Sequence, residues 1–455
     1  INKYSSKIGI TKAIEEGLIY VYRERLENDY DKEKFGRIIS EMSFNVLKQQ
    51  IYSTQLQDKS IPINVIDDTV EIGYTVLRMN KAGGAFVPDK GAAELVHTRN
   101  TGRRLESLAE AVLLNDYVLL VGETGVGKTS LIRYLAYLTN NNLRRFNLNG
   151  QTDKAEIIGG VRPQGDGSLA WVDAVLVEAM KKGYWIILDE INLAEPQVVE
   201  RINSLLDDSR NLVLREHKGE KLLKQEEYDK LSDKEKASGM FYPIHPNFRL
   251  FATMNPADYA GRNVLSPAFM NRFRVKWIED LSETEMYEIL EQKYALPGHI
   301  LTKILLLHNN TRALSDKLEV EEQEPFCFTM RHLTRLAERV KMRMQVKAGM
   351  TAAEMEQMAA REAYDVYGGI LRTEHDQEIF DDMFQTVFAG TRLVTDVKLL
   401  SDKQGVEIAG IRIEKNVNRK GMDIPGEEAK LVDVPTTVRY LSKIVVSVKM
   451  NERVL

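Results

Sequence analysis

The sequence has little cysteine, no long hydrophobic run and no large excess of one charge. Its single cysteine, Cys327, cannot form a disulfide within the chain, which is typical of proteins kept in a reducing compartment. No apolar segment approaches the length that spans a bilayer, and no signal-peptide pattern opens the chain. We therefore expect a soluble, intracellular protein that does not bind membranes.

The charges nearly cancel. Against 67 Asp and Glu there are 62 Lys and Arg, a net charge of −5, which argues against a broad surface for nucleic acid. We therefore expect no direct sequence-specific nucleic-acid binding. With 43% hydrophobic residues among 455, the chain has ample material for packed cores, and its length allows about three domains of ordinary size.

A glycine-rich octapeptide, residues 122–129, reads GETGVGKT and matches the phosphate-binding pattern GxxxxGK[ST] at every fixed position. It follows the apolar run 118–121 and precedes a helical stretch, 130–138. Backbone amides of the loop would surround the phosphates, Lys128 would reach the β- and γ-phosphates, and the Thr129 hydroxyl would bind Mg²⁺. The residues expected to hold the nucleotide are Gly122, Glu123, Thr124, Gly125, Val126, Gly127, Lys128, Thr129 and Ser130. The segment predicts a protein that binds a nucleoside triphosphate.

Two adjacent carboxylates, Asp189 and Glu190, end the apolar run 184–188, about sixty residues after this loop. Asp189 would hold Mg²⁺, directly or through water, and Glu190 would orient and deprotonate the attacking water. Apolar runs that end in acids are also common entries to turns, but the distance from the loop favours the catalytic interpretation.

Alternating strands and helices predict the fold. Further strands are expected at 146–149, 186–188 and 250–253, in a mostly parallel sheet. After residue 283 the strand patterns end and helices are expected at 285–294, 299–308, 330–344 and 351–367. We expect a doubly wound α/β nucleotide-binding domain over 69–281, with an all-α lid domain over 282–404.

The chain also repeats itself. Residues between 70 and 119 recur between 406 and 455 at a constant offset of 336 (431 minus 95 for the Leu-Val pair), without a gap. A weaker echo relates 21–35 to 366–380 at an offset of 345 (366 minus 21). We expect 405–455 to be the start of a following module and 1–68 the end of a preceding lid with its linker, so that the chain is part of a tandem array.

Four segments carry a family resemblance: GETGVGKT, NLNGQTD at 147–153, LDEINLA at 188–194 and NFRLFATMNP at 247–256. Together they make residues 70–384 resemble a AAA+ module of the dynein-related group, which includes midasin and the MoxR-type ATPases. The resemblance implies that the nucleotide is ATP, that Mg²⁺ accompanies it, and that hydrolysis drives movement.

The same resemblance assigns three further residues. Asn255 matches the sensor-1 position, where a polar side chain at a strand end holds the γ-phosphate or the lytic water. Arg272 matches the arginine finger, which acts in the neighbouring module's site, and Arg274 is its rival. Arg331 matches the sensor-2 arginine of the lid, with Arg335 as its rival.

Two inserts depart from a minimal module. The glycines within 157–171 predict a loop or hairpin, and the nearly balanced charges of 218–236 predict a solvated helical excursion. In the family that the chain resembles, such inserts usually handle the substrate. A midasin-like protein carries six unlike modules in one polypeptide, forms a ring and acts on maturing large ribosomal subunits in the nucleus or nucleolus. A MoxR-like protein assembles identical subunits in the cytoplasm and activates partner proteins. A third interpretation is a structural ring segment that binds ATP without turnover. The repeats favour the midasin-like interpretation, with a protein or ribonucleoprotein client.

Overall fold

The structure is a computed structural model. It describes residues 25–26, 31–35, 61–91, 93–165, 167–207, 209–256, 263–314, 328–346, 349–371, 373–389, 399–401, 405–408, 411–414 and 435–450. The chain divides into two compact units, 1–281 and 282–455, and each is described by itself. Cys327 and residues 257–262 lie outside the described residues.

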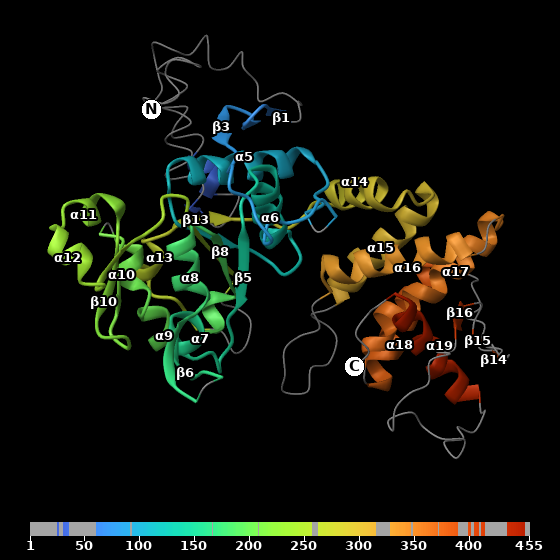
Figure 1. The fold of residues 1–455 in the computed structure, drawn as a ribbon. Coiled ribbons are helices and arrows are strands. Elements are labelled where there is room, and N and C mark those ends of the chain that lie inside the picture. Colours follow the sequence, from blue (N-terminus) through green and yellow to red (C-terminus); the bar gives the residue numbers. More distant parts are fainter. Residues whose placement is uncertain are drawn as a thin grey trace, which may run out of the picture. The chain divides into compact units, whose positions relative to one another are not determined.

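The first unit is built on a five-stranded parallel sheet (Figure 1). Its strands lie in the order β13-β4-β12-β8-β5. Their bounds are β4 Val118–Val121, β5 Leu143–Asn147, β8 Trp185–Asp189, β12 Arg249–Met254 and β13 Arg274–Trp277. All residues of β4 and β8 are buried, as expected for central strands covered on both faces. The expected doubly wound α/β fold is confirmed.

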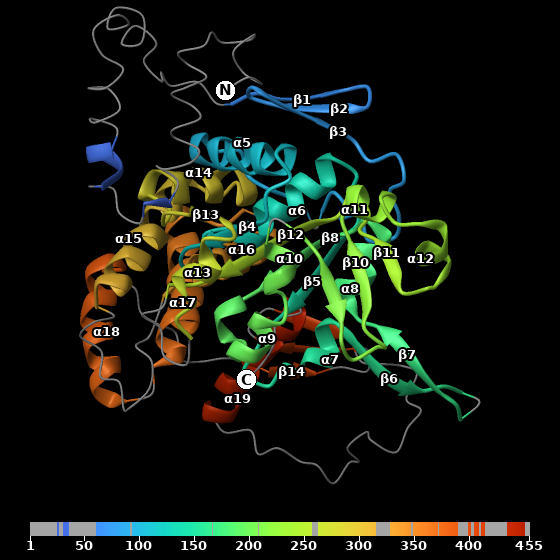
Figure 2. The same cartoon turned by 90° about the vertical axis from the view of Figure 1, so that its left-hand side faces the viewer.

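Alternate residues of these strands face two separate cores. Val118 and Leu120 pack with helices α5 (Arg99–Leu113) and α6 (Lys128–Leu138) on one face. Leu119 and Val121 pack on the other face with α8 (Val175–Lys182), α9 (Pro196–Glu200) and α10 (Asn203–Leu206). The period of two along each strand therefore places a hydrophobic layer on both sides of the sheet. Figure 2 shows α5 and α6 together on one side of it.

Three small sheets are attached to this unit. The meander β1 (Ile63–Ile66), β2 (Thr69–Ile72) and β3 (Thr75–Arg78) packs on α5 through Val70, Ile72 and Leu77. The hairpin β6 (Gly159–Pro163) and β7 (Leu169–Asp173) follows the short helix α7 (Lys154–Ile157) and extends away from the parallel sheet (Figure 2). The structure thus confirms the loop or hairpin expected at 157–171.

The second insert is partly helical, as expected, but its elements extend beyond the predicted 218–236 and run from Leu212 to Pro243. It contains β9 (Leu212–Leu214), β10 (Glu220–Leu223), α11 (Gln225–Asp229), α12 (Asp233–Ala237) and β11 (Phe241–Pro243). The three strands form one sheet in the order β11-β10-β9, and neither helix has a buried residue. The last short helix of the unit, α13 (Pro267–Met270), precedes β13.

In the part of the second unit that the structure describes, five α-helices come first, joined by short turns where the joining residues are described. They are α14 (Glu283–Tyr294), α15 (Gly298–Leu314), α16 (Met330–Val346), α17 (Ala352–Tyr367) and α18 (Glu374–Val387). Capping boxes fix two of their starts, because Ser282 and Thr351 each exchange hydrogen bonds with the glutamate three residues later. The remaining elements are β14 (Leu399–Ser401), β15 (Gly405–Ile408), β16 (Ile411–Glu414) and α19 (Pro435–Lys449).

Over the residues that the structure describes, no helix combines the length and the apolar character needed to cross a membrane.

An aromatic cluster in the helical unit contains a titratable side chain. His332 of α16 lies beside Phe328 and Tyr367, and its Nδ1 accepts a hydrogen bond from the Thr329 backbone N–H at 3.1 Å. Burial lowers the pKa of His332, and the nearby Arg335 lowers this pKa further. The folded unit therefore holds this imidazole neutral at a pH where the unfolded chain would protonate it.

We expect acid to destabilise the helical unit through His332. With its pKa depressed on folding, the stabilisation is present above about pH 6.5, the ordinary histidine value, and is lost as the pH falls below it. His332→Asn keeps an acceptor for the Thr329 amide but does not titrate. The midpoint of thermal unfolding should fall less between pH 7.5 and 5.5 in this variant than in the natural chain; an equal fall in both would contradict the expectation.

Candidate nucleotide site

The phosphate-binding loop joins β4 to α6. The Gly122 backbone lies so close to the Ile278 carbonyl that a Cβ at residue 122 would stand 2.4 Å from this oxygen, so no other residue fits. Gly125 and Gly127 have φ of 94° and 91°, and a Cβ at Gly127 would meet no atom within 4 Å. The helix then begins at Lys128. The positive φ angles therefore give the loop the curled backbone that a phosphate-binding loop requires.

Lys128 is almost completely buried, with 8% of its surface exposed. Its Nζ donates to the carbonyl oxygens of Gly122 at 2.6 Å and Glu123 at 2.8 Å, and to Asn255 Oδ1 at 2.8 Å. These contacts tie the loop lysine to the end of β12. The structure therefore brings Lys128 and Asn255 together, which the sequence placed 127 residues apart.

Asp189 ends β8, and each of its carboxylate oxygens has a donor from a neighbouring strand. The Thr253 hydroxyl of β12 donates to Oδ1. On the other side, Arg145 of β5 donates through Nε to Oδ2 at 2.7 Å and forms an ion pair with it. Asp189 is 5% exposed, so these partners satisfy a charge that would be costly to bury alone.

Glu190 has an unusual backbone. Its φ and ψ are 57° and 48°, in the left-handed region that a glutamate rarely adopts. The Glu190 N–H donates to the Thr253 hydroxyl oxygen at 3.2 Å. Strained residues of this kind are concentrated at functional sites, where the surrounding structure holds them in place.

Asn255 follows the last residue of β12 and is 4% exposed. Its carbonyl oxygen accepts a hydrogen bond from Asn192 Nδ2 at 3.0 Å. Asn192 belongs to the turn Ile191–Leu193 directly after Glu190, so its side chain links the turn that follows β8 to the backbone that follows β12.

The residues present fit Mg²⁺. Among the described residues, no three His, Cys, Asp or Glu side chains gather as a metal site of their own. An ion at Thr129 and Asp189 would therefore draw its remaining ligands from phosphate oxygens and water, which is the usual arrangement for Mg²⁺ beside a nucleotide. A hydroxyl and a carboxylate are oxygen ligands of the type that this ion prefers.

Arg272 lies at the other end of the sheet. It comes just before β13, whose first residue, Arg274, pairs with Val118 at the start of β4, whereas the phosphate loop follows the end of β4. Arg272 Nε donates to Asp207 Oδ1 at 2.5 Å, and Arg274 Nε donates to Asp116 Oδ2 at 3.3 Å. The structure therefore brings neither arginine to the phosphate loop of its own unit.

Arg331 and its rival Arg335 both lie exposed on α16, four residues apart on one helical face. They belong to the helical unit, and the exposure of both leaves the choice between them open.

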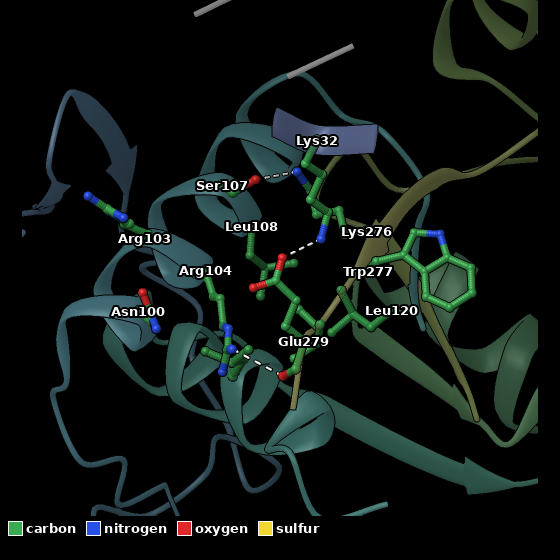
Figure 3. A pocket seen from close by; sticks show the side chains of 12 residues that line it. Lys32, Asn100, Arg103, Arg104, Ser107, Leu108, Leu120, Lys276, Trp277 and Glu279 are labelled. Carbon is green, nitrogen blue, oxygen red and sulfur yellow. Dashed lines mark hydrogen bonds and ion pairs between the residues drawn. The ribbon is translucent and has the colours of Figure 1, made fainter. Parts of the chain in front are cut away.

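A cationic cavity is lined by residues of α5, β4, α6 and β13 (Figure 3). It has a volume of about 150 Å³, and Leu131 of the loop helix is part of its wall. The charged side chains in its lining are Lys32, Arg103, Arg104, Lys276 and Glu279. Lys32 pairs with Glu279, Lys276 donates to Ser107, and Arg104 donates to the Glu279 carbonyl at 3.1 Å. The excess of positive charge favours the approach of an anionic nucleotide.

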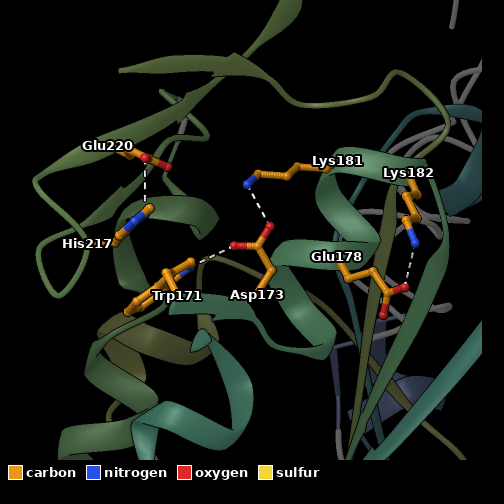
Figure 4. Close-up of polar contacts among 7 residues, drawn as sticks. All are labelled: Trp171, Asp173, Glu178, Lys181, Lys182, His217 and Glu220. Atoms are coloured by element: carbon orange, nitrogen blue, oxygen red, sulfur yellow. Dashed lines mark hydrogen bonds and ion pairs between the residues drawn. The ribbon is translucent and has the colours of Figure 1, made fainter. Parts of the chain in front are cut away.

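The two inserts contact each other (Figure 4). Trp171 of β7 stacks on His217 of the second insert, with ring centroids 4.6 Å apart and planes 9° from parallel. Trp171 Nε1 donates to Asp173 at 2.8 Å, and Asp173 also accepts from Lys181 of α8 at 2.6 Å. The hairpin, the second insert and α8 are therefore linked.

Thr253 and Arg145 both contact Asp189, but sequence patterns identified neither of them. Thr253 lies inside the segment NFRLFATMNP, but its hydroxyl reaches Asp189 only because β12 pairs with β8. Arg145 stands in the strand that precedes the segment NLNGQTD and carried no motif of its own.

Comparison with known proteins defines the class. Residues 117–273 match the AAA domain of the dynein-related subfamily, and residues 285–389 match the midasin AAA lid domain. The parallel sheet, the phosphate loop and these matches make the chain a AAA+ ATPase. Within that class, the lid matches the model of the midasin lid, in agreement with the resemblance that the sequence predicted.

Two midasins are among its relatives. The chain is 38% identical to the midasin of Dictyostelium discoideum over 205 residues, 45% of this chain and 3% of that protein. With the midasin of Giardia intestinalis it shares 28% identity over 356 residues, 74% of this chain and 7% of that protein. It thus spans a small part of the length of these relatives. A Thermotoga maritima RuvB mutant superposes with a TM-score of 0.39 at 16% identity, over 65% of this chain and 80% of that one.

Removing the loop lysine should weaken nucleotide binding. Lys128→Ala deletes a buried cation that would exchange neutral carbonyl oxygens for charged phosphate oxygens, so we expect at least about 10-fold lower affinity for ATP. Fluorescent ATP titration measures it. Lys81→Ala is the control, since the side chain of this lysine is 84% exposed and pairs with Asp68. A comparable loss of ATP affinity in both variants would show that Lys128 does not bind the phosphates.

Proposed function

We propose that this chain hydrolyses ATP with Mg²⁺ at the phosphate-loop site and uses the reaction to remodel a protein or ribonucleoprotein complex. One observation carries the proposal: Lys128, Asp189 and Asn255 converge at the carboxyl edge of three adjacent parallel strands, with Glu190 next to them. Ligands of doubly wound sheets bind at this edge. Each of these residue types suits phosphoryl transfer to water.

The contacts give each side chain a task. On binding, Lys128 leaves the carbonyl oxygens of Gly122 and Glu123 for the phosphates, which are charged and therefore stronger acceptors. The amide oxygen of Asn255 is released at the same time and becomes an acceptor for the attacking water. Glu190 takes a proton from that water as the water oxygen bonds to the γ-phosphorus. The bond from this phosphorus to the β–γ bridging oxygen breaks, and ADP leaves. Mg²⁺, held by Thr129 and Asp189, would neutralise charge that develops on the phosphate oxygens.

Repeated elements support a tandem ring. The three strands β14, β15 and β16 and the helix α19 each begin 336 residues after β1, β2, β3 and α5 (435 minus 99 for the helices). The pairing repeats as well, because Ile63 faces Ile72 and Leu399 faces Ile408 in antiparallel register. The offset is the one that relates the two sequence segments. We infer that the elements from β14 onward open a second module, six residues before the boundary that the sequence placed at 405 (405 minus 399), and that a preceding lid with its linker ends before β1.

A neighbouring module is then available to complete the site. Arg272 lies at the sheet edge opposite the phosphate loop of its own unit, so its guanidinium is suited to reach the γ-phosphate of an adjacent module instead. The lid arginine Arg331 would report the nucleotide state to the helical unit.

The hairpin and the second insert form the client-handling part in this proposal. Leu169 and Val161 of the hairpin are 71% and 59% exposed, and the Trp171–His217 stack joins the hairpin to the second insert. The similarity to midasins favours maturing large ribosomal subunits as the client and the nucleus or nucleolus as the compartment.

Glu190→Gln should separate binding from turnover. The amide is nearly isosteric but cannot accept the proton. ATP affinity should therefore stay within about twofold, while turnover measured with the neighbouring modules present falls by at least about 100-fold. Sucrose-gradient sedimentation of cell extracts should then show the variant retained on large-subunit precursors. Undiminished turnover would remove Glu190 as the base, and sedimentation apart from every ribosomal particle would remove the proposed client.

Concentration dependence should distinguish the two ring types. If the neighbouring modules belong to the same polypeptide, turnover per chain stays flat and close to the Glu190→Gln blank across a wide range of protein concentration, although ATP binds tightly. Arg272→Ala should then leave ATP binding at its own site unchanged. Turnover that climbs steeply with concentration would instead favour a MoxR-like assembly of identical subunits.

A further inference from the structure

One hydroxyl group connects the two acids at the end of β8. The Thr253 hydroxyl donates its only hydrogen to Asp189 Oδ1 and accepts the Glu190 backbone N–H at 3.2 Å. A hydroxyl has one hydrogen and two lone pairs, so the acceptor role toward Glu190 leaves the hydrogen for the carboxylate. The two bonds are therefore compatible and fix each other's direction.

The strand register produces this bridge. Ala252 of β12 pairs with Leu188 of β8, so Thr253 stands one residue further along, level with Asp189. Thr253 has no exposed surface, and no water competes for its hydroxyl in such a position. The β-branched side chain also has few accessible rotamers, which holds the oxygen in place.

The two bonds act on different properties of the site. The bond to Asp189, together with Arg145 on the other oxygen, sets the plane of the carboxylate that would face the metal. The bond from the Glu190 N–H holds that residue in its left-handed conformation, with φ at 57°, and so determines where its side chain leaves the backbone. If the Thr253 hydroxyl is removed, the Glu190 N–H loses this acceptor. The left-handed conformation of Glu190 then loses a stabilising hydrogen bond.

We propose that Thr253 is a positioning residue for hydrolysis, whose hydroxyl sets both the metal-facing carboxylate of Asp189 and the direction of Glu190. The inference rests on the proposed roles of these two acids. Thr253 itself touches neither the nucleotide nor the water in this proposal. It acts through residues on the neighbouring strand.

Three substitutions isolate the hydroxyl. Thr253→Val keeps the shape of the side chain and removes the hydroxyl, whereas Thr253→Ser keeps the hydroxyl and removes the methyl group. Thr139→Val is the matched control: Thr139 is 1% exposed, and its hydroxyl donates to the Leu135 carbonyl at 2.7 Å and accepts from Asn141 Nδ2 at 2.8 Å. The same kind of bridge is thus removed at the far end of the loop helix.

The measurements are fluorescent ATP affinity with Mg²⁺ and with EDTA, and ATP turnover with the neighbouring modules present, with kcat and KM determined separately. In Thr253→Val, affinity in EDTA should stay within about twofold, while the gain in affinity on adding Mg²⁺ and the kcat should each fall by about 10- to 100-fold, with KM for the ATP complex changing less. Thr253→Ser should recover most of both, and Thr139→Val should match the natural chain. The Mg²⁺ gain is measurable even where turnover is low.

Several outcomes would overturn the inference. If Thr253→Val behaves like Thr139→Val, or if Thr253→Ser is as impaired as Thr253→Val, the hydroxyl has no positioning role. Should Thr253→Val not fold, Thr253→Ala against Thr253→Ser makes the same comparison, because these two differ only in the hydroxyl. Glu190→Gln distinguishes a failure of the proposed function from a failure of the Thr253 inference. Full turnover in Glu190→Gln contradicts the role of Glu190 as the base. If Glu190→Gln has no turnover and Thr253→Val has full turnover, only the role of Thr253 is contradicted.

Discussion

The parallel register of β4, β12 and β8 is the constraint on which the site depends. Val121, Met254 and the end of β8 reach the same edge of the sheet because all three strands run in one direction and are buried on both faces. A slip of one residue would turn each hydrophobic set to the opposite core, so the register is strongly specified. The phosphate loop, Asn255 and Asp189 inherit their relative positions from it.

Burial then decides how the polar groups at this edge behave. Lys128 and Asp189 are both more than nine-tenths buried, and an ion in such a place must have partners. Each has several: carbonyl oxygens and Asn255 for the lysine, Thr253 and Arg145 for the aspartate. These partners hold the groups in place before any ligand arrives. A triphosphate therefore meets a prepared site, and binding exchanges one set of contacts for another instead of ordering loose side chains.

The sequence predicted those parts of the site that are local in the chain. Glycines, lysine and threonine of the phosphate loop form one octapeptide, and Asp189 and Glu190 end a recognisable apolar run. The lid helices followed from apolar spacing, and the hairpin from its glycines. Thr253 and Arg145 could not be predicted in this way, because they meet Asp189 across 64 and 44 residues of sequence through strand pairing. The Trp171–His217 stack has the same origin, since it joins two inserts that carry no common pattern.

Contacts in the second unit provide a path by which a conformational change caused by hydrolysis would reach the next module in the proposed tandem arrangement. Arg339 of α16 donates to Ser447 of α19 at 3.1 Å, and Lys443 of α19 lies 3.5 Å from Asp365 of α17. Glu362, completely buried between Arg339 and Arg343, holds the first of these arginines in position. Breaking these contacts would leave buried charges without partners, so the helices of the lid and α19 are held together. A lid that follows the nucleotide of its own module would therefore carry the first helix of the next module with it, and the chain would transmit the change through packed helices without needing a flexible linker to relay it.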